Sequence, residues 1–315
     1  MRQVKQLPLF VTQPTFRDRD VKSVTFKGGF DYPVHRWFRL TPSFSPGLVE
    51  DVLAHWNLLP NARVLDPFCG VGTTSLICQA KGLCSWGVEL NPLLHFVTRV
   101  KTRGIEKPAR LGIAAEETIA QAWQLLARLS ELSTETFLVD YDEAIPKIRN
   151  VTRWWSPLVL KKLVALRVTL AKATSPIEII DLLQLAIASI LIEVSNGSRG
   201  HPSLSFAQAF KEDAPVFGRF LEQVEMMTRD LEGFPQTRPE TVILRGNSKH
   251  LEKVLPTGSQ FDAVITSPPY PNRYSYARET RPHMFYLGLI QDSQEVGELE
   301  IEAIGGKWGK AISVL

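Results

Sequence analysis

The sequence predicts an α/β fold in which a Rossmann-like sheet carries a large helical insertion and is incomplete at its C-terminal side. Three observations support this prediction. Residues 63–89 read as strand, glycine loop, helix and strand, residues 95–240 show almost only helical patterns, and strands return at 241–246 and 261–266. Open α/β sheets bind ligands at the carboxyl ends of their strands, so both parts of the sheet are expected to face one crevice.

These changes of pattern divide the 315 residues into three parts. Residues 1–95 are expected to hold an N-terminal segment and the first half of the pocket-forming domain. Residues 96–240 form the helical insertion, and residues 241–315 supply the second part of the domain.

The composition is that of a globular protein, with 44% hydrophobic and 22% charged residues, which excludes a disordered or collagen-like chain. The net charge of +3 is too small to indicate a nucleic-acid partner by itself. Three cysteines are too few for a disulfide framework or an all-cysteine zinc site, so no metal site and a reducing cytoplasm are expected.

No membrane segment is expected. The N-terminus leads into no long apolar run that would indicate a signal peptide. The most apolar stretch, residues 177–194, contains Glu178, Asp181, Gln184 and Glu193, the first three at helical intervals. It is therefore interpreted as a core helix rather than a membrane span.

A helix is expected to begin at Ser45-Pro46, because serine caps helices and proline suits their first turn. Apolar residues recur at helical spacing from there to Trp56. Residues 63–66 then form a short strand that runs into a loop containing Gly70 and Gly72.

Thr73-Thr74 opens the next helix, which is expected to end near Lys81 because Gly82 follows. Residues 85–89 form the second strand, and Asn91-Pro92 has the pattern of a cap followed by a first-turn proline.

Long helical patterns then fill the insertion, at residues 111–132, 158–170, 177–194 and 217–231. Strand patterns return only at 241–246 and 261–266, and the second of these runs directly into Ser267-Pro268-Pro269-Tyr270.

The first candidate site is the stretch from Asp66 to Thr74. Glycines at 70 and 72 let the backbone approach a ligand closely, and the amides at the following helix start suit a carboxylate or phosphate. Asp66 could accept a hydrogen bond from a ligand amine. A structural turn explains the glycines equally well when the loop is considered alone.

Two further features strengthen that candidate. Glu89 ends the second strand, where an acid can bind ribose hydroxyls, although an acid near a helix start is also favoured by the helix dipole. In Ser267–Tyr270, two prolines stiffen the chain and leave carbonyls as fixed acceptors, while Ser267 adds an oxygen and Tyr270 a flat apolar face. This group suits an aromatic amine, whereas a rigid loop with a packed tyrosine is the simpler alternative.

Together these segments resemble the amino-group DNA methyltransferases that use S-adenosyl-L-methionine. Residues 66–74 are similar to the cofactor motif of that family, and Ser267–Tyr270 resembles its catalytic tetrapeptide, in the serine form most often associated with cytosine-N4 enzymes. Asn247, in a turn where the family often has aspartate, keeps an acceptor oxygen for adenine but lacks the charge. Residues 41–56 match the family's methionine-side motif weakly, and the insertion matches no motif.

The resemblance implies the following roles. The catalytic residues would be Ser267, Pro268, Pro269 and Tyr270, and the cofactor-binding residues would be Asp66, Pro67, Phe68, Gly70, Gly72, Thr73, Thr74, Glu89 and Asn247. Ser267 Oγ and the Pro268 carbonyl would accept hydrogen bonds from the cytosine amine and direct its lone pair at the methyl group. Tyr270 would stack on a base flipped out of double-stranded DNA. No Pro-Cys pair of the kind cytosine-C5 enzymes use is present, and Cys69 is interpreted as a packing residue.

Two basic segments are candidates for DNA contact. Residues 271–281 follow the tetrapeptide, and Arg273, Tyr276 and Arg278 within them suit phosphate contact and stacking. Residues 149–172 contain six basic residues, no acid and the pair Trp154-Trp155. The second segment is read either as a DNA-facing surface or as a basic helix face with core tryptophans.

The end of the chain is short for the family's seven-stranded sheet, because 49 residues follow Thr266 and contain only two short apolar runs, 286–290 and 299–304. The strand ending at Thr266 is therefore expected to form an exposed edge. From this we expect that the chain is part of a split or truncated enzyme, and that a second polypeptide completes the sheet.

The leading interpretation is a cytosine-N4 DNA methyltransferase of a restriction-modification system, which implies the cytoplasm of a bacterial or archaeal cell. Three alternatives remain: an adenine-N6 DNA methyltransferase, which usually has aspartate or asparagine in place of Ser267; an RNA amino-methyltransferase; and an inactive subunit that binds DNA or cofactor.

Overall fold

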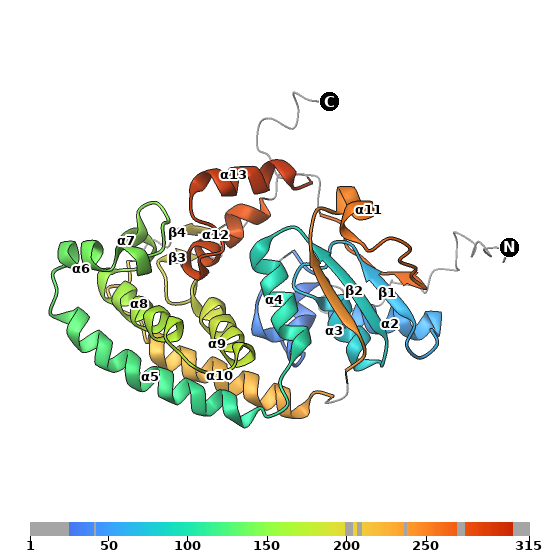
Figure 1. Ribbon diagram of the computed structural model, residues 1–315, viewed down its shortest axis with the longest axis horizontal. Helices are drawn as coiled ribbons and strands as arrows, with labels where there is room; N and C mark the ends of the chain where they lie inside the picture. Colours follow the sequence, from blue (N-terminus) through green and yellow to red (C-terminus); the bar gives the residue numbers. More distant parts are fainter. Residues whose placement is uncertain are drawn as a thin grey trace.

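A four-stranded parallel sheet organises the protein, in the order β5-β2-β1-β6 (Figure 1). The computed structural model describes residues 25–40, 42–198, 204–206, 210–235, 238–269 and 275–304. The strands are β1 (Arg63–Asp66), β2 (Cys84–Glu89), β5 (Thr241–Arg245) and β6 (Ala263–Val264). Many helices accompany the sheet, so the predicted α/β, Rossmann-like class is confirmed.

The helices nearest the sheet begin where the sequence predicts. Ser45 Oγ accepts a hydrogen bond from Gly47 N and caps α2 (Pro46–Trp56). Asn91 Oδ1 accepts from the amides of Leu93 and Leu94 and caps α4 (Pro92–Arg103). Between them lies α3 (Thr73–Ala80), and both α3 and α4 contact β2. A short helix, α11 (Leu251–Val254), follows β5.

The insertion between β2 and β5 is a helical layer beside the sheet (Figure 1). Its helices are α5 (Ala109–Ser130), α6 (Thr134–Asp140), α7 (Val151–Trp154), α8 (Pro157–Ala171), α9 (Ile177–Ile190) and α10 (Val216–Gly233). A two-stranded antiparallel ladder joins β3 (Gly197–Ser198) to β4 (Ser205–Phe206). Short 3₁₀ turns lie at η2 (Phe26–Gly29), η3 (His35–Trp37), η4 (Asp142–Ala144) and η5 (Ser248–His250).

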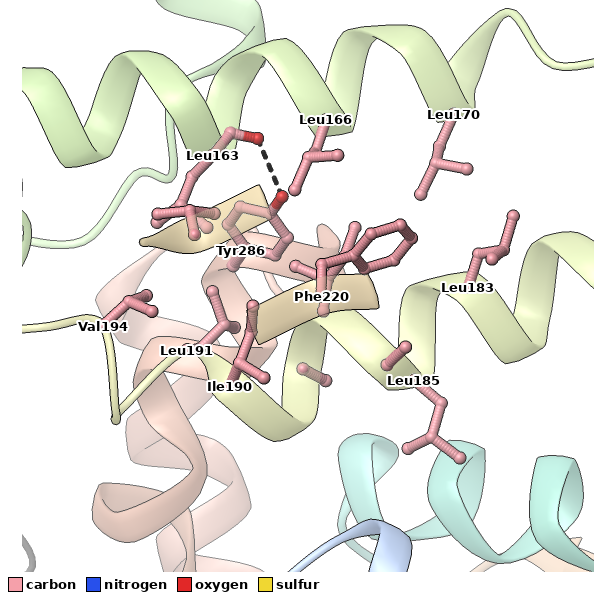
Figure 2. Packing of buried hydrophobic residues seen from close by; sticks show 14 of the residues in the cluster. Leu163, Leu166, Leu170, Leu183, Leu185, Ile190, Leu191, Val194, Phe220 and Tyr286 are labelled. Carbon is pink, nitrogen blue, oxygen red and sulfur yellow. Dashed lines mark hydrogen bonds between the residues drawn. The ribbon is translucent and has the colours of Figure 1, made fainter. Parts of the chain in front are cut away.

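The last two helices join the insertion to the sheet. They are α12 (Tyr276–Leu287) and α13 (Ser293–Glu302). Tyr286 of α12 enters the apolar core of the insertion, and its hydroxyl donates to the Leu163 carbonyl of α8 at 2.8 Å (Figure 2). Leu166, Phe220 and Leu183 from three insertion helices pack in the same core (Figure 2).

The sheet has an exposed edge at β6, as the sequence analysis predicts. Within the described residues β6 pairs only with β1, and Val264 is 51% exposed. The predicted strand 261–266 has regular geometry only at Ala263–Val264. The apolar runs 286–290 and 299–304 begin inside the ends of α12 and α13 rather than forming strands.

The stretch 177–194 is interpreted correctly as a core helix, although α9 ends at Ile190. Among the described residues, no helix combines the length and apolar character required to cross a bilayer.

One buried carboxylate fastens the insertion to the N-terminal segment. Asp230 of α10 is 4% exposed, and its oxygens accept hydrogen bonds from Val34 N (2.9 Å), Trp37 Nε1 (2.9 Å) and the Arg36 guanidinium (2.5 and 3.0 Å). These donors lie almost 200 positions away in the sequence, so the contact is set by the tertiary fold alone.

The Asp230→Ala variant is expected to lose about 3 kcal/mol or more of unfolding free energy, because buried donors would remain without their acceptor. Urea titration followed by circular dichroism measures this loss. Glu225→Ala is the matched control on the same helix, since Glu225 forms an exposed pair with Arg229 and its removal should cost less than about 1 kcal/mol. Equal losses in the two variants would contradict the anchoring role of Asp230.

Candidate active site

The loop after β1 has a backbone that requires glycine. Gly70 has φ +52° and Gly72 has φ +83°, and Gly72 is the N-cap of α3. A Cβ atom at Gly72 would also lie only 2.7 Å from the Thr98 side chain. The glycine pattern thus has a local structural cause and brings the loop backbone close to α4.

Glu89, at the end of β2, holds this loop in place. One carboxylate oxygen accepts from Gly70 N at 2.9 Å and the other from Asn91 N at 2.8 Å. Burial raises the pKa of Glu89 to about 7, although these two hydrogen bonds favour the ionised form. Glu89 therefore has lone pairs left for a ligand and an ionisation near neutral pH.

Asp66 connects the glycine loop to the strand that precedes the serine–proline segment. Its Oδ1 accepts from Phe68 N at 3.1 Å and from the Thr266 hydroxyl at 2.7 Å. Asp66 is 1% exposed, and burial raises its pKa to about 6. Its Oδ2 is buried and has no hydrogen-bond partner among the described residues. Asp66 therefore joins the two loops while one of its oxygens stays unsatisfied.

The two predicted loops border one pocket. On one side the lining includes Pro67, Phe68, Gly70, Glu89 and Asn247. On the other side it includes Ser267, Pro269 and Tyr276. Gly70 and Ser267 are brought together because β1 and β6 are neighbouring parallel strands whose carboxyl ends meet.

Several predicted residues do not line the pocket. Asp66, Gly72, Thr73 and Thr74 lie behind it; Thr73 Oγ1 is 2.9 Å from His35 Nε2, and Thr74 Oγ1 donates to the Ile265 carbonyl at 3.4 Å. Pro268 is exposed and outside the lining. Tyr270 and Arg273 lie outside the described residues.

Asn247 already has protein partners. Its Oδ1 accepts from Lys249 N at 3.0 Å and caps η5, and its Nδ2 lies 3.4 Å from the carbonyl of Glu302 at the end of α13. A ligand that contacts the Asn247 amide would compete with this long hydrogen bond. The end of α13 therefore closes this side of the pocket.

The apolar wall of the pocket includes residues that sequence reasoning missed. Leu40, Leu94, Ala277, Leu299 and Ile304 all line it. Leu94, Ala277 and Leu299 belong to three helices, while Leu40 and Ile304 lie in two separate non-helical segments. Asn91 also lines the pocket, and its signal was present in the sequence as a helix cap, but a cap alone does not indicate a site.

Cys69 is a packing residue, in agreement with its interpretation from the sequence. It is 4% exposed, and burial raises the pKa of its thiol well above the usual value. Its side chain fills the space where Gly87 of β2 has no Cβ, since a Cβ there would lie 2.9 Å from Cys69 Sγ.

The two predicted DNA-contact segments differ in the structure. Arg278 is exposed at the start of α12, beside Tyr276 of the pocket lining. The stretch 149–172 is not a free cationic surface, and both of its tryptophans are buried. Four of its six basic side chains have partners within the insertion: Lys161 Nζ donates to the Leu132 carbonyl, Lys162 pairs with Asp213, Arg167 donates to the Ala144 carbonyl, and Arg153 lies over the Phe206 ring.

Three curated proteins with sequences similar to this chain are Type II methyltransferases. The chain is similar to the Type II methyltransferase M.BsoBI of Geobacillus stearothermophilus (24% identical over 313 residues, 88% of this chain and 57% of the relative). It is also similar to M.AvaI of Nostoc sp. (23% over 322 residues, 93% and 64%) and to M.MvaI of Kocuria varians (25% over 273 residues, 80% and 57%), both Type II methyltransferases. No protein-family model and no solved structure matches the chain.

The resemblance to DNA methyltransferases is therefore confirmed, and S-adenosyl-L-methionine as the methyl donor agrees with these relatives. The chain spans 57–64% of the length of these relatives. The relatives' names do not distinguish cytosine-N4 from other specificities, and they give no support for a second polypeptide.

The raised pKa of Glu89 predicts how stability depends on pH. Because the folded pKa of about 7 exceeds the unfolded value of 4.5, the protonated form of Glu89 favours the folded state below pH 4.5, and this contribution is lost as the pH rises from about 4.5 to about 7. Relative to Glu89→Gln, which does not titrate, the wild type should lose roughly 2 kcal/mol of unfolding free energy between pH 5 and pH 8, after allowance for water in the adjoining pocket. Urea titrations at both pH values measure the difference, and a pH-independent difference would show that Glu89 has an ordinary pKa.

Proposed function

We propose that this chain carries the catalytic core of an S-adenosyl-L-methionine-dependent DNA methyltransferase of a restriction-modification system, which methylates the N4 amine of cytosine in a specific double-stranded sequence. The observation that supports this most is the single pocket bordered by Gly70 and Glu89 on one side and Ser267 and Pro269 on the other. A methyl donor and an amine acceptor bound to these two sides would be in contact.

The residues of the pocket fit the proposed cofactor. The Glu89 carboxylate faces the pocket and suits ribose hydroxyls, and Leu40, Phe68 and Leu94 give apolar walls for an adenine ring. Asp66 lies behind the pocket and supports it through the hydrogen bonds of its Oδ1 to Phe68 N and the Thr266 hydroxyl. When bound, S-adenosyl-L-methionine supplies an electrophilic methyl group on a sulfonium.

The acceptor side orients the amine without a covalent nucleophile. The N4 lone pair of cytosine is delocalised into the ring and is a poor nucleophile. Hydrogen bonds from its two N–H groups to Ser267 Oγ and the Pro268 carbonyl would favour a pyramidal nitrogen and aim its lone pair into the pocket. The burial and raised pKa of Cys69 also speak against a cysteine mechanism.

Three alternative functions remain for a chain with this pocket. Ser267 favours cytosine N4 over adenine N6, since adenine-N6 enzymes usually have an acid or asparagine in that position. An adenine-N6 enzyme would methylate adenine in DNA, an RNA amino-methyltransferase would methylate RNA, and an inactive subunit would bind cofactor or DNA without methyl transfer.

Nucleoside mass spectrometry distinguishes these possibilities. The purified chain is incubated with radiolabelled S-adenosyl-L-methionine and either plasmid DNA or total RNA, and each product is digested to nucleosides. N4-methylcytosine in DNA is expected. N6-methyladenine or label only in RNA would select an alternative, and cofactor binding without any transfer would indicate the inactive subunit.

Substitutions should separate the two sides of the pocket. Ser267→Ala and Tyr270→Ala should lower turnover by about 100-fold or more with little change in cofactor affinity, because the first removes an acceptor for the reacting amine and the second removes the ring that would stack on its base. Glu89→Ala and Asp66→Ala should instead weaken cofactor binding measured by isothermal titration. The opposite pattern would overturn the assigned roles.

The exposed Arg278 is proposed to contact a DNA phosphate, as is Arg273. Arg278→Ala should weaken binding to a labelled duplex several-fold and reduce its salt dependence by about one phosphate contact. Arg229→Ala is the control, because Arg229 is an exposed arginine on α10 that already pairs with Glu225. Equal effects of the two variants would show that Arg278 acts only through the overall positive charge and would contradict a phosphate contact at this residue.

The edge of the sheet at β6 supports a further proposal about assembly. A half-exposed Val264 on a strand paired on one side is a ready site for strand addition. A second polypeptide is proposed to pair with this edge, and residues 241–315 would then be the second part of a shared catalytic domain. Size-exclusion chromatography with and without a co-expressed neighbouring reading frame tests this, and a stable, active monomer would refute it.

A further inference from the structure

Helix α12 lies at the junction of the pocket and the insertion. Its first residues, Tyr276 and Ala277, line the pocket, while Tyr286 near its other end is hydrogen-bonded to Leu163 in the core of the insertion (Figure 2). The helix also follows the serine–proline segment directly in the sequence. Its first turn therefore forms part of the acceptor side of the pocket, while its other end is held by the insertion.

A buried hydrogen bond joins α12 to the cofactor side. Asn91 Nδ2 donates to Thr280 Oγ1 at 2.8 Å, and these residues are only 4% and 2% exposed. Thr280 Oγ1 in turn donates to the Tyr276 carbonyl at 2.8 Å. Because water cannot replace either partner at such burial, loss of one group leaves the other unsatisfied.

Asn91 is held on its other side by Glu89. The backbone N–H of Asn91 donates to Glu89 Oε1, and Glu89 Oε2 accepts from Gly70 N. The side-chain Oδ1 of Asn91 caps α4. A continuous series of hydrogen bonds thus runs from the glycine loop through Glu89, Asn91 and Thr280 to Tyr276. On the same helix, Glu279 Oε1 accepts from Leu204 N, next to β4 in the insertion.

We infer that Asn91 and Thr280 are positioning residues, which transmit the binding of a cofactor ribose at Glu89 to helix α12 and so fix the acceptor side of the pocket. This inference rests on the proposed function. A ligand that restrains the Glu89–Asn91 turn also restrains α12 through the Asn91–Thr280 bond, and the start of α12 then opens less often. Cofactor binding thereby orders the site that receives the base.

Three substitutions isolate the hydroxyl of Thr280. Thr280→Val keeps the shape of the side chain and removes the acceptor for Asn91, whereas Thr280→Ser keeps the hydroxyl. Thr118→Val is the matched control, since Thr118 is 5% exposed and its hydroxyl likewise bonds the carbonyl four residues earlier, Ala114, but in α5. Any effect of losing that bond within a helix appears equally in the control.

Hydrogen exchange measured by mass spectrometry tests the inference independently of methyl transfer. The probe is S-adenosylhomocysteine at saturation, with binding verified by isothermal titration for every variant. In the wild type, exchange in residues 276–287 should slow by about fivefold or more on binding. Thr280→Val should bind the probe but lose this slowing, whereas Thr280→Ser and Thr118→Val should retain it.

The possible failures are distinct. If the wild type does not bind S-adenosylhomocysteine, the proposed function fails and this inference with it. If the wild type binds without slowing of exchange in α12, or Thr280→Val retains the slowing, or Thr118→Val loses it equally, the inference alone is wrong.

A second variant covers the case in which Thr280→Val does not fold. Asn91→Ser keeps an oxygen that can cap α4 but lacks the Nδ2 group that reaches Thr280 Oγ1, so it should also lose the slowing of exchange. Retention of the slowing in Asn91→Ser would overturn the inference. Where both single variants fold, their effects should not add in the double variant, because each removes the same bond.

Discussion

The carboxylate of Asp230 is the anchor on which the arrangement of sheet, insertion and pocket depends. It fixes Val34, Arg36 and Trp37 to α10, and Val34 adopts φ +64°, a conformation that is costly for a β-branched residue. The segment is thereby held between the insertion and the glycine loop, where His35 meets Thr73. The pocket wall at Leu40 follows directly from this segment.

A buried lysine, Lys101, lies beside this segment and has no carboxylate partner among the residues that the structure describes. Lys101 Nζ donates to the carbonyls of His35 (2.9 Å) and Val71 (3.5 Å), and burial lowers its pKa to about 7. Even the neutral amine has two N–H groups for these two acceptors. Burial also lowers the pKa of His35 to about 3, so His35 is neutral at physiological pH. The contact between the N-terminal segment and the glycine loop therefore needs no buried ion pair.

The predictable parts of this protein are those encoded by neighbouring residues. The bounds of β1, the starts of α2 and α4 and the cap at Asn91 follow from strand patterns, Ser-Pro and Asn-Pro. The hydrogen bonds of Asp230 with residues 34–37 and the contribution of α13 to the pocket wall were not predictable, because they bring together residues far apart in sequence. Of the two readings of the basic stretch 149–172, the helix face with core tryptophans agrees with the structure, since Trp154 and Trp155 are buried. Charge alone could not separate the two readings, because the backbone carbonyls that bind Lys161 and Arg167 leave no signal in the sequence.

Strand order explains why so long an insertion can coexist with a small catalytic pocket. The insertion leaves the sheet after β2 and returns at β5, and these two strands are neighbours with a continuous parallel register from Ser85–Thr241 to Glu89–Arg245. Its length therefore does not alter the other pair, β1 and β6, whose carboxyl ends carry the glycine loop and the serine–proline segment. The Thr266–Asp66 hydrogen bond joins these ends, and the insertion acts on them only through contacts such as α12 and residues 34–37. Sequence change in the insertion can thus alter what approaches the pocket while the distance between its two sides is kept by the sheet.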